Sequence, residues 1–320
     1  MSIATTRSFE FLYKVSLARG QMPARVWIPL ASTDAFQDVI EHSFELANSI
    51  RGQVSVHEQN KVLYLLLQTS DVEQSISLRF KITRRARTSA PPSSDGYGVS
   101  LETLGLAPFM TGNARVPVDG SLGEEARDVV ARCTSPLEKA RAIFDHVLAT
   151  YSYDCSGCTP AKGESLGDLT VACDLKLGTC TELHGLLVAY LRGAGVPARF
   201  AFGFNIPGRP HGLIGGYHCW SEAYLPGSGW FPIDVSEARK RPAGAERDFY
   251  FGNLDQNRVQ FSTGRDLTLV PAQFSGPLDK LIFPLVEQND SVITPQLEFS
   301  FSDLQPSLHR EYAAAAAIAT

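Results

Sequence analysis

The stretch LGTCTELHGLLVAYLRGAGVPARF, residues 177–200, decides the fold. Thr179 and Glu182 stand at its start with the spacing of a capping box, which predicts that a helix begins at Cys180. Apolar residues then occupy almost every side of this helix, so we expect it to be buried. They are Leu183, Leu186, Leu187, Val188, Tyr190 and Leu191. Two glycines and a proline end the helix, namely Gly193, Gly195 and Pro197.

A predicted antiparallel sheet follows this helix. Its strands are Arg199–Phe204, Tyr217–Leu225 and Trp230–Val235, and the turn Pro226–Gly229 joins the last two. A buried helix followed by an antiparallel sheet predicts an α+β core.

Helical patterns also precede the deciding stretch. Ser135–Glu138 is a second capping box with proline at the first helical position, and this helix should run to about Thr150. Leu122–Cys133 has helical spacing as well. The intervening segment Tyr151–Gly178 has few periodic apolar residues, so we interpret it as a long loop with a functional role.

Residues 1–115 are predicted to be β-rich. Apolar residues alternate at Phe9, Phe11, Tyr13, Val15 and Leu17, which is the pattern of a half-buried strand. Further strands are expected at Val54–His57, Val62–Gln68 and Ile76–Ile82, and a loop at Thr88–Gly98. We therefore predict a β-rich domain over 1–115, a sandwich or barrel, and a catalytic domain over 116–275. Residues 276–320 would be a C-terminal extension with an Ala-rich tail.

Composition excludes several classes of protein. Hydrophobic residues make up 44% and charged residues 20% of the 320 residues, which is ordinary globular usage. The net charge of −5 argues against a nucleic-acid or anionic-membrane partner, and no apolar run is long enough to span a bilayer. The N-terminus has no signal-peptide pattern, which predicts a cytoplasmic protein; a chain shortened at that end would leave the periplasm open. The oligomeric state does not follow from the sequence.

The candidate chemistry centres on Cys180. A thiol at the first position of a helix faces free backbone N–H groups, which favour the nucleophilic thiolate. An acyl-transfer cysteine also needs a base and a group that orients the base. His218 lies in a predicted strand, and Asp234 follows the next strand across the hairpin turn. The hairpin would place His218 beside Asp234, facing the start of the Cys180 helix.

Four separated elements resemble the transglutaminase-like superfamily of papain-fold thiol enzymes. They are Gly178-Thr179-Cys180, LRGAGVPAR at 191–199, YHCWSE at 217–222 and GWFPID at 229–234. The match runs from about Pro136 to Arg265, and residues 253–259 and 264–266 resemble an extension found in prokaryotic members. The resemblance implies Cys180 as nucleophile, His218 as base and Asp234 as the orienting acid.

The resemblance implies acyl transfer through a thioester, with no organic cofactor. Animal transglutaminases use calcium, but this sequence has no apparent acidic cluster of the required type, so we predict no calcium dependence. The substrate would be a peptide, a protein, or an acyl amide or thioester, and hydrolysis of a peptide or amide bond is favoured. Two alternatives stay open: an acyltransferase that passes the acyl group to an amine, and a silent peptide-binding module. The oxyanion needs hydrogen-bond donors, for which we expect the Cys180 backbone N–H and a side chain such as Tyr153 or Asp168.

Several neighbours could have other roles. His184 lies one helical turn after Cys180 and could be a rival base, but a supporting role is favoured. Trp220 is expected to pack the sheet core beside His218, and Glu222 to be a buried structural acid. Cys219 should point to the opposite strand face. Arg258 and Arg265 could bind Asp266 or a substrate carboxylate, and the ion pair is favoured.

A zinc site is the remaining alternative. Cys155, Cys158 and Cys173, with Cys180, approach the spacing of a zinc ribbon. There is no second C-x-x-C, however, and ligation would abolish the Cys180 nucleophile. We therefore predict no metal.

Overall fold

The computed structural model describes residues 5–18, 23–45, 51–57, 60–68, 73–89, 102–113, 115–154 and 169–304. The first part of the chain is β-rich and ends in a short 3-10 helix. Its elements are β1 (Thr6–Leu17), β2 (Ala24–Leu30), β3 (Gln37–Glu45), β4 (Arg51–His57), β5 (Asn60–Leu67), β6 (Gln74–Arg85), β7 (Arg87–Thr88) and the 3-10 helix Ala107–Phe109.

Helices and strands alternate in the middle of the chain, and strands return at its end. The middle elements are α1 (Gly120–Val129), α2 (Pro136–Thr150), β8 (Ser152–Tyr153), α3 (Leu169–Leu175), β9 (Leu177–Gly178), α4 (Cys180–Gly193), β10 (Ala198–Asn205), β11 (His211–Leu213), β12 (His218–Leu225), β13 (Gly229–Ile233), α5 (Val235–Arg239) and α6 (Ala245–Asp248). The last elements are β14 (Asn253–Leu254), β15 (Arg258–Thr263), β16 (Leu285–Gln288), β17 (Ser291–Val292) and β18 (Gln296–Asp303).

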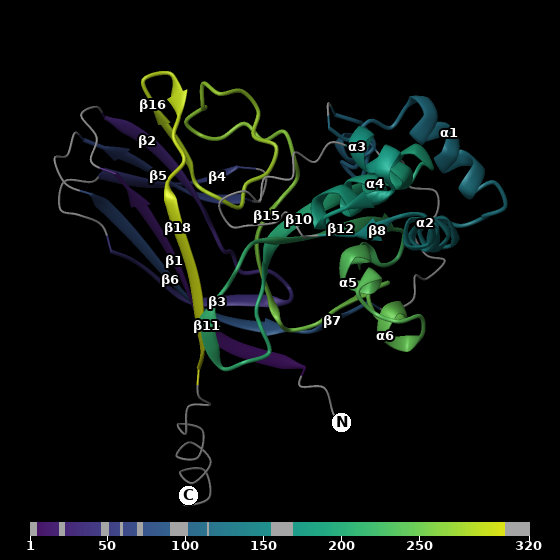
Figure 1. Ribbon diagram of the computed structural model, residues 1–320, viewed down its shortest axis with the longest axis horizontal. Coiled ribbons are helices and arrows are strands. Elements are labelled where there is room, and N and C mark those ends of the chain that lie inside the picture. Colours follow the sequence, from purple (N-terminus) through teal and green to yellow (C-terminus); the bar gives the residue numbers. More distant parts are fainter. Residues whose placement is uncertain are drawn as a thin grey trace, which may run out of the picture.

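The two ends of the chain build one β-rich region together (Figure 1). One sheet has the strand order β11-β18-β1-β6-β3, and the other has the order β17-β16-β2-β5-β4. Strand β1 pairs along its length with β6 on one side and with β18 on the other. The late strands therefore complete sheets that the first residues begin. The domain bounds that we expect from the sequence stay predictions.

The helices gather on the other side of the molecule, around α4 (Figure 1). Helix α4 packs against β12 and β10 of the sheet β13-β12-β10-β15, and against α1, α2, α3 and α5. Its residues from Cys180 to Leu191 are all buried, as the apolar sequence predicts. This arrangement confirms the predicted α+β class, with a buried helix against an antiparallel sheet after a β-rich region.

A shared aromatic core joins the two regions. The ring of Phe11 on β1 lies 5.1 Å from that of Phe204 on β10 and 5.4 Å from that of Phe261 on β15. Gly203 permits a bulge where β10 meets β15, because a Cβ at this position would lie 1.8 Å from the Val259 carbonyl oxygen. The close approach brings β15 beside the part of β10 that pairs with His218.

Four predicted boundaries need correction. Helix α1 ends at Val129, before Cys133. The segment expected to be one loop contains β8, α3 and β9, since Ser152 and Tyr153 pair with residues 177–178. Val235 belongs to α5, because the Asp234 side chain caps that helix and ends the strand. Arg87 and Thr88 form a short strand, whereas most of the predicted Thr88–Gly98 loop lies outside the described residues, as does the Ala-rich tail.

Candidate active site

Local sequence places Cys180 at the start of α4. The Thr179 side chain caps the helix, and the Glu182 carboxylate accepts a 2.8 Å hydrogen bond from the Thr179 backbone N–H, which completes the predicted capping box. Cys180 is therefore the first helical residue, and its side chain is nearly buried. The Thr179 hydroxyl accepts from the backbone N–H groups of Thr181 and Glu182. The positive end of the helix dipole at this terminus favours a thiolate at Cys180.

The hairpin β12–β13 brings His218 and Asp234 together. His218 is the first residue of β12, and Asp234 follows the last residue of β13. The His218 Nε2 lies 2.8 Å from the Asp234 Oδ2. Because Nε2 is occupied in this way, Nδ1 is the ring nitrogen that is left for the Cys180 thiol, whose hydrogen bond and charge help to raise the pKa of His218.

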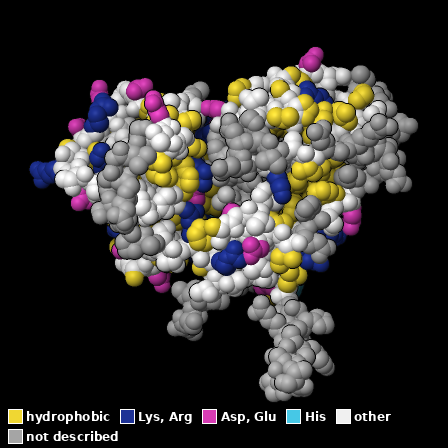
Figure 2. Space-filling view, turned by 180° about the vertical axis from the view of Figure 1, so that it is seen from behind, with side chains coloured by type: hydrophobic (Ala, Val, Ile, Leu, Met, Phe, Trp, Pro, Cys, Tyr) yellow, Lys and Arg dark blue, Asp and Glu magenta, His cyan; other side chains and the backbone are white. Residues whose placement is uncertain are grey.

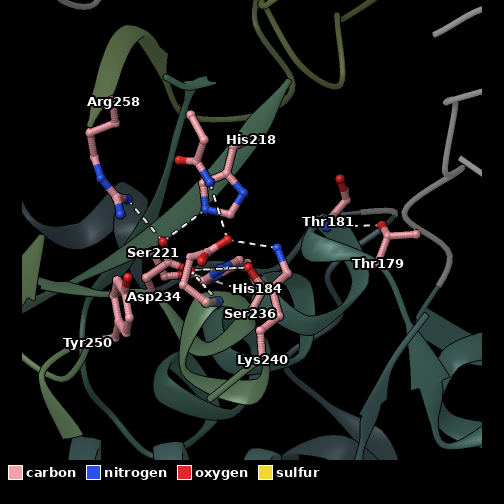
Figure 3. Close-up of polar contacts among 12 residues, drawn as sticks. Thr179, Thr181, His184, His218, Ser221, Asp234, Ser236, Lys240, Tyr250 and Arg258 are labelled. Atoms are coloured by element: carbon pink, nitrogen blue, oxygen red, sulfur yellow. Dashed lines mark hydrogen bonds and ion pairs between the residues drawn. The ribbon is translucent and has the colours of Figure 1, made fainter. Parts of the chain in front are cut away.

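Asp234 is fully buried and receives hydrogen bonds on both oxygens (Figure 3). Its Oδ1 lies 3.1 Å from the Ser236 Oγ, 3.0 Å from the Glu237 backbone N and 3.3 Å from the His184 Nε2. Its Oδ2 accepts from His218 and, at 3.0 Å, from the Arg258 Nη1. We call these groups the carboxylate network. A buried carboxylate needs such partners to remain charged.

The electrostatics of the site favour a thiolate beside an imidazolium. A hydrogen bond from Cys219 lowers the pKa of Cys180 well below its usual range; burial opposes this shift, and the hydrogen bond and charge of His218 add to it. Burial lowers the pKa of His218, but Asp234 and Cys180 outweigh it and raise the pKa to about 9. Burial raises the pKa of Asp234, but the charge of His218 and the hydrogen bond of His184 bring it well below the usual range.

His184 contacts Asp234 on the side away from His218. Its Nδ1 lies 3.0 Å from the Ser221 Oγ, and its Nε2 is shared between the Ser236 Oγ and Asp234. Both ring nitrogens therefore have partners within the network, which fits a supporting role better than that of a rival base. His184 also links the helix of Cys180 to the carboxylate that holds His218.

Cys219 is fully buried in the core, as expected. Ser221, two residues along β12, contacts His184 of α4, so this face of the strand lies against the helix of Cys180. The sequence did not predict the consequence, which is that a hydrogen bond from Cys219 lowers the pKa of Cys180.

Of the other predicted site residues, Tyr153 lies near Cys180 and Trp220 lies near His218. Burial raises the pKa of Tyr153, and so does the charge of nearby Cys180, whereas Lys240 lowers it. The Lys240 Nζ lies 4.4 Å from the centre of the Tyr153 ring. The Trp220 ring centre is 6.3 Å from that of His218. Asp168 lies outside the described residues.

Arg258 and Arg265 both form ion pairs, as predicted, but with other carboxylates than Asp266. Arg258 binds Asp234 and Asp255, and Arg265 binds Asp279; neither binds Asp266. Glu222 is buried and accepts from Arg87 and Arg199, as expected of a structural acid.

Sequence reasoning missed that Arg258, Ser236 and Glu237 belong to the site. For Arg258 the signal is the NLDQNR stretch at 253–258, and for Ser236 and Glu237 it is the DVSE sequence at 234–237, in which Asp234 caps a helix.

The zinc alternative gains no support from the residues that can be placed. Within the described ranges, no three His, Cys, Asp or Glu side chains are grouped to hold a metal ion. Cys155 and Cys158 lie outside these ranges, and Cys173 and Cys180 are free thiols.

The surface and the helices bear on the expected partners. On the face in Figure 2, basic and acidic side chains are interspersed among apolar and neutral ones. Among the described segments, no helix is both long enough and apolar enough to cross a bilayer.

Part of the chain is similar to a known family. The model of the transglutaminase-like superfamily core domain matches residues 124–235. An uncharacterised protein of Haemophilus influenzae is 24% identical over 87% of this chain and 85% of its own length. The uncharacterised Bacillus subtilis protein YebA is 27% identical, over 38% of this chain and 19% of its own length.

A solved structure shares the fold. It comes from Cytophaga hutchinsonii, was described provisionally as a cysteine protease, and is 16% identical to this chain. The similarity covers 95% of this chain and 93% of that one, with a TM-score of 0.64. Since it spans nearly both chains, the β-rich region and the helical region occur together in both proteins.

Proposed function

The chain contains the core domain of the transglutaminase-like superfamily, and we propose that it is a cysteine-dependent acyl-transfer enzyme that hydrolyses a peptide or amide bond. The observation that carries this proposal is the 2.8 Å contact of the His218 Nε2 with the buried Asp234, together with the low pKa of Cys180, to which His218 contributes. A nucleophile, a base and a group that orients the base are the parts that thioester chemistry requires.

The first half of the reaction forms the thioester. The Cys180 thiolate attacks the substrate carbonyl, and the Cys180 backbone N–H at the start of α4 stabilises the oxyanion. The His218 imidazolium then gives its proton to the leaving amine as the C–N bond breaks. Asp234 keeps the ring oriented and stabilises its charge before the transfer.

The second half regenerates the enzyme. Neutral His218 takes a proton from water while the water oxygen attacks the thioester carbonyl. The C–S bond breaks, the carboxylic acid leaves, and the thiolate and imidazolium are restored. An amine in place of water would give transamidation through the same thioester, so the acceptor is what a test must identify.

The first test uses iodoacetamide, which needs no knowledge of the substrate. Intact-protein mass spectrometry would follow alkylation between about pH 5 and 9 in the wild type, Cys180→Ala and His218→Ala. We expect one alkylation that is already fast at about pH 6 and absent in Cys180→Ala. In His218→Ala it should slow to the rate of an ordinary thiol. A wild-type Cys180 that reacts no faster than Cys133 would contradict the proposal.

The second test identifies the acceptor with phenyl thioacetate as an activated acyl donor. Release of benzenethiol reports turnover, and mass spectrometry of the acyl product distinguishes acetate from an amide when hydroxylamine is added. We expect acetate to predominate. An amide product that dominates at millimolar amine would assign the chain to the acyltransferases instead.

A further inference from the structure

We propose that Arg258 is a positioning residue that sets how tightly Asp234 holds the His218 proton. This inference rests on the proposed function and adds a member to its triad. In Figure 3, the contacts of Arg258 and His218 converge on one oxygen of Asp234. The Arg258 Nη1 lies 3.0 Å and the His218 Nε2 2.8 Å from that Oδ2.

The guanidinium of Arg258 is held in place from three directions. Its side chain is 1% exposed, and its Nη2 lies 3.2 Å from the Asp255 Oδ2. Its central carbon lies 5.1 Å from the Trp220 ring centre, two residues along β12 from His218. A planar, permanently charged group fixed in this way acts as a constant positive charge beside the carboxylate.

Asp255 is itself anchored, so the arginine cannot simply exchange partners. The Asp255 Oδ1 accepts a 2.7 Å hydrogen bond from the Asn257 backbone N, and its Oδ2 lies 3.4 Å from the Tyr250 hydroxyl. The bulge at Gly203 holds β15, and with it Arg258, close to the start of β12. The whole arrangement depends on backbone geometry that the sheet fixes.

Sharing one oxygen has a chemical consequence. A carboxylate that served His218 without a competing cation would bind the imidazolium more tightly, and a general acid with too high a pKa transfers its proton poorly. Arg258 draws part of the Asp234 charge toward itself. The proton on His218 therefore remains available to the leaving group, while Asp234 stays ionised.

Besides Arg258 on β15, other titratable groups face the pair of His218 and Asp234. They are Cys180 and His184 from α4, Cys219 from β12, and Glu237, Lys240, Tyr250 and Asp255 from the segments around α5 and β14. Of all these groups, Arg258 is the one that donates a hydrogen bond to the Oδ2 that His218 uses. A variant at Arg258 therefore tests the sharing itself.

The test is the pH profile of Cys180 alkylation, which should have two steps. The lower step reports formation of the thiolate, and the upper one reports loss of the His218 proton near pH 9, after which the thiolate reacts faster. In Arg258→Met we expect the upper step to move to higher pH by about one unit, because a nearby positive charge is lost. Turnover of phenyl thioacetate should fall at least about tenfold. Arg258→Lys keeps the charge and should restore the upper step.

Asp255→Asn provides a second variant with the opposite expected sign. It removes a negative charge beside Arg258, so the upper step should move to lower pH. The Asp255 side chain is 22% exposed, and the change should fold even if Arg258→Met does not. Shifts in the same direction for both variants would overturn the proposal.

Arg265→Met is the matched control. Arg265 is 2% exposed, forms an ion pair with Asp279 and lies over Phe200, but has no contact with Asp234. It should lower stability and leave both steps in place. An Arg258→Met profile like that of Arg265→Met would show that Arg258 is merely structural. If wild-type Cys180 lacks fast alkylation, the proposed function itself fails.

Discussion

The two regions of this molecule have opposite kinds of centre. Where the β-rich region meets the catalytic sheet, aromatic rings pack edge to face, with Phe80 5.5 Å from Phe261 and Tyr13 4.7 Å from Phe299. Beneath α4, the centre is instead the carboxylate network, in which Asp234, His184 and Arg258 are all fully buried. The first centre gains free energy from apolar burial, whereas the second must offset the cost of burying charge.

The difference teaches what each region contributes. When an aromatic core loses one ring, the protein loses stability but the geometry of the site is kept, because the contacts of the core are many and not directional. The carboxylate network has few, directional contacts, and each member leaves another charged group unpaired when it is removed. Matched substitutions in the two centres should therefore cost similar stability and differ in chemistry.

The largest effect is expected at Asp234. Asp234→Asn keeps the size of the side chain but leaves Arg258 and His218 without their shared carboxylate. We expect turnover to fall about 10⁴-fold, as loss of an orienting acid does in other triads. The free energy of unfolding should fall by about 3–5 kcal/mol. Turnover of phenyl thioacetate and urea unfolding would measure the two losses; a variant with near wild-type turnover would contradict the role of Asp234.

Phe80→Ala is the matched change in the aromatic core. Phe80 is 1% exposed, and we expect its loss to lower the free energy of unfolding by about 3–5 kcal/mol. Below the unfolding transition, Cys180 alkylation at pH 6 should be as fast as in the wild type. Slower alkylation by folded Phe80→Ala would mean that the two centres are coupled.

A smaller, purely kinetic effect is expected at Tyr153. If its hydroxyl donates to the oxyanion, Tyr153→Phe should lower kcat about 10²-fold. Iodoacetamide alkylation forms no oxyanion, so its rate should not change. Loss of both rates together would show that Tyr153 supports the thiolate rather than the transition state.

The smallest effect concerns the pH dependence of stability. The two groups to count are Cys180 and His218. Between pH 6.5 and about 9, they share one proton in the folded protein, and it is on His218. In the unfolded chain they also share one proton, but it is on the cysteine, whose ordinary pKa is 9.0. Both states then bind equal numbers of protons, and the pair contributes no slope to the wild type.

Cys180→Ala should expose the contribution of His218. Asp234 still raises the pKa of His218 in the folded variant. Protonated His218 therefore stabilises the folded protein fully below pH 6.5, and this stabilisation is lost as the pH rises through the pKa of His218 in the folded state. Urea unfolding from pH 6 to 9 should show a decline that approaches about 1.4 kcal/mol per pH unit, absent in the wild type. Parallel curves for the two proteins would contradict the thiolate–imidazolium pair.

Local signals in the sequence predicted much of the region around Cys180. The capping boxes at Thr179 and Ser135, the apolar run of α4 and the hairpin turn before Trp230 are short-range patterns, and the structure follows them closely. These patterns predicted that Cys180 begins a helix and that His218 lies beside Asp234. Both features depend only on neighbours within one helix or one hairpin.

Contacts between distant segments were decided by tertiary structure. The pairing of β18 with β1 joins residues from the two ends of the chain, and no local pattern specifies which strands share a sheet. The place of Arg258 on the same oxygen as His218, and of Cys219 beside Cys180, depends on how β15 and α4 dock on β12. By itself, the sequence determined the start of the Cys180 helix and the hairpin that holds His218 and Asp234. The packing of sheet and helix determined their partners, because hydrogen bonds across elements exist only after those elements meet.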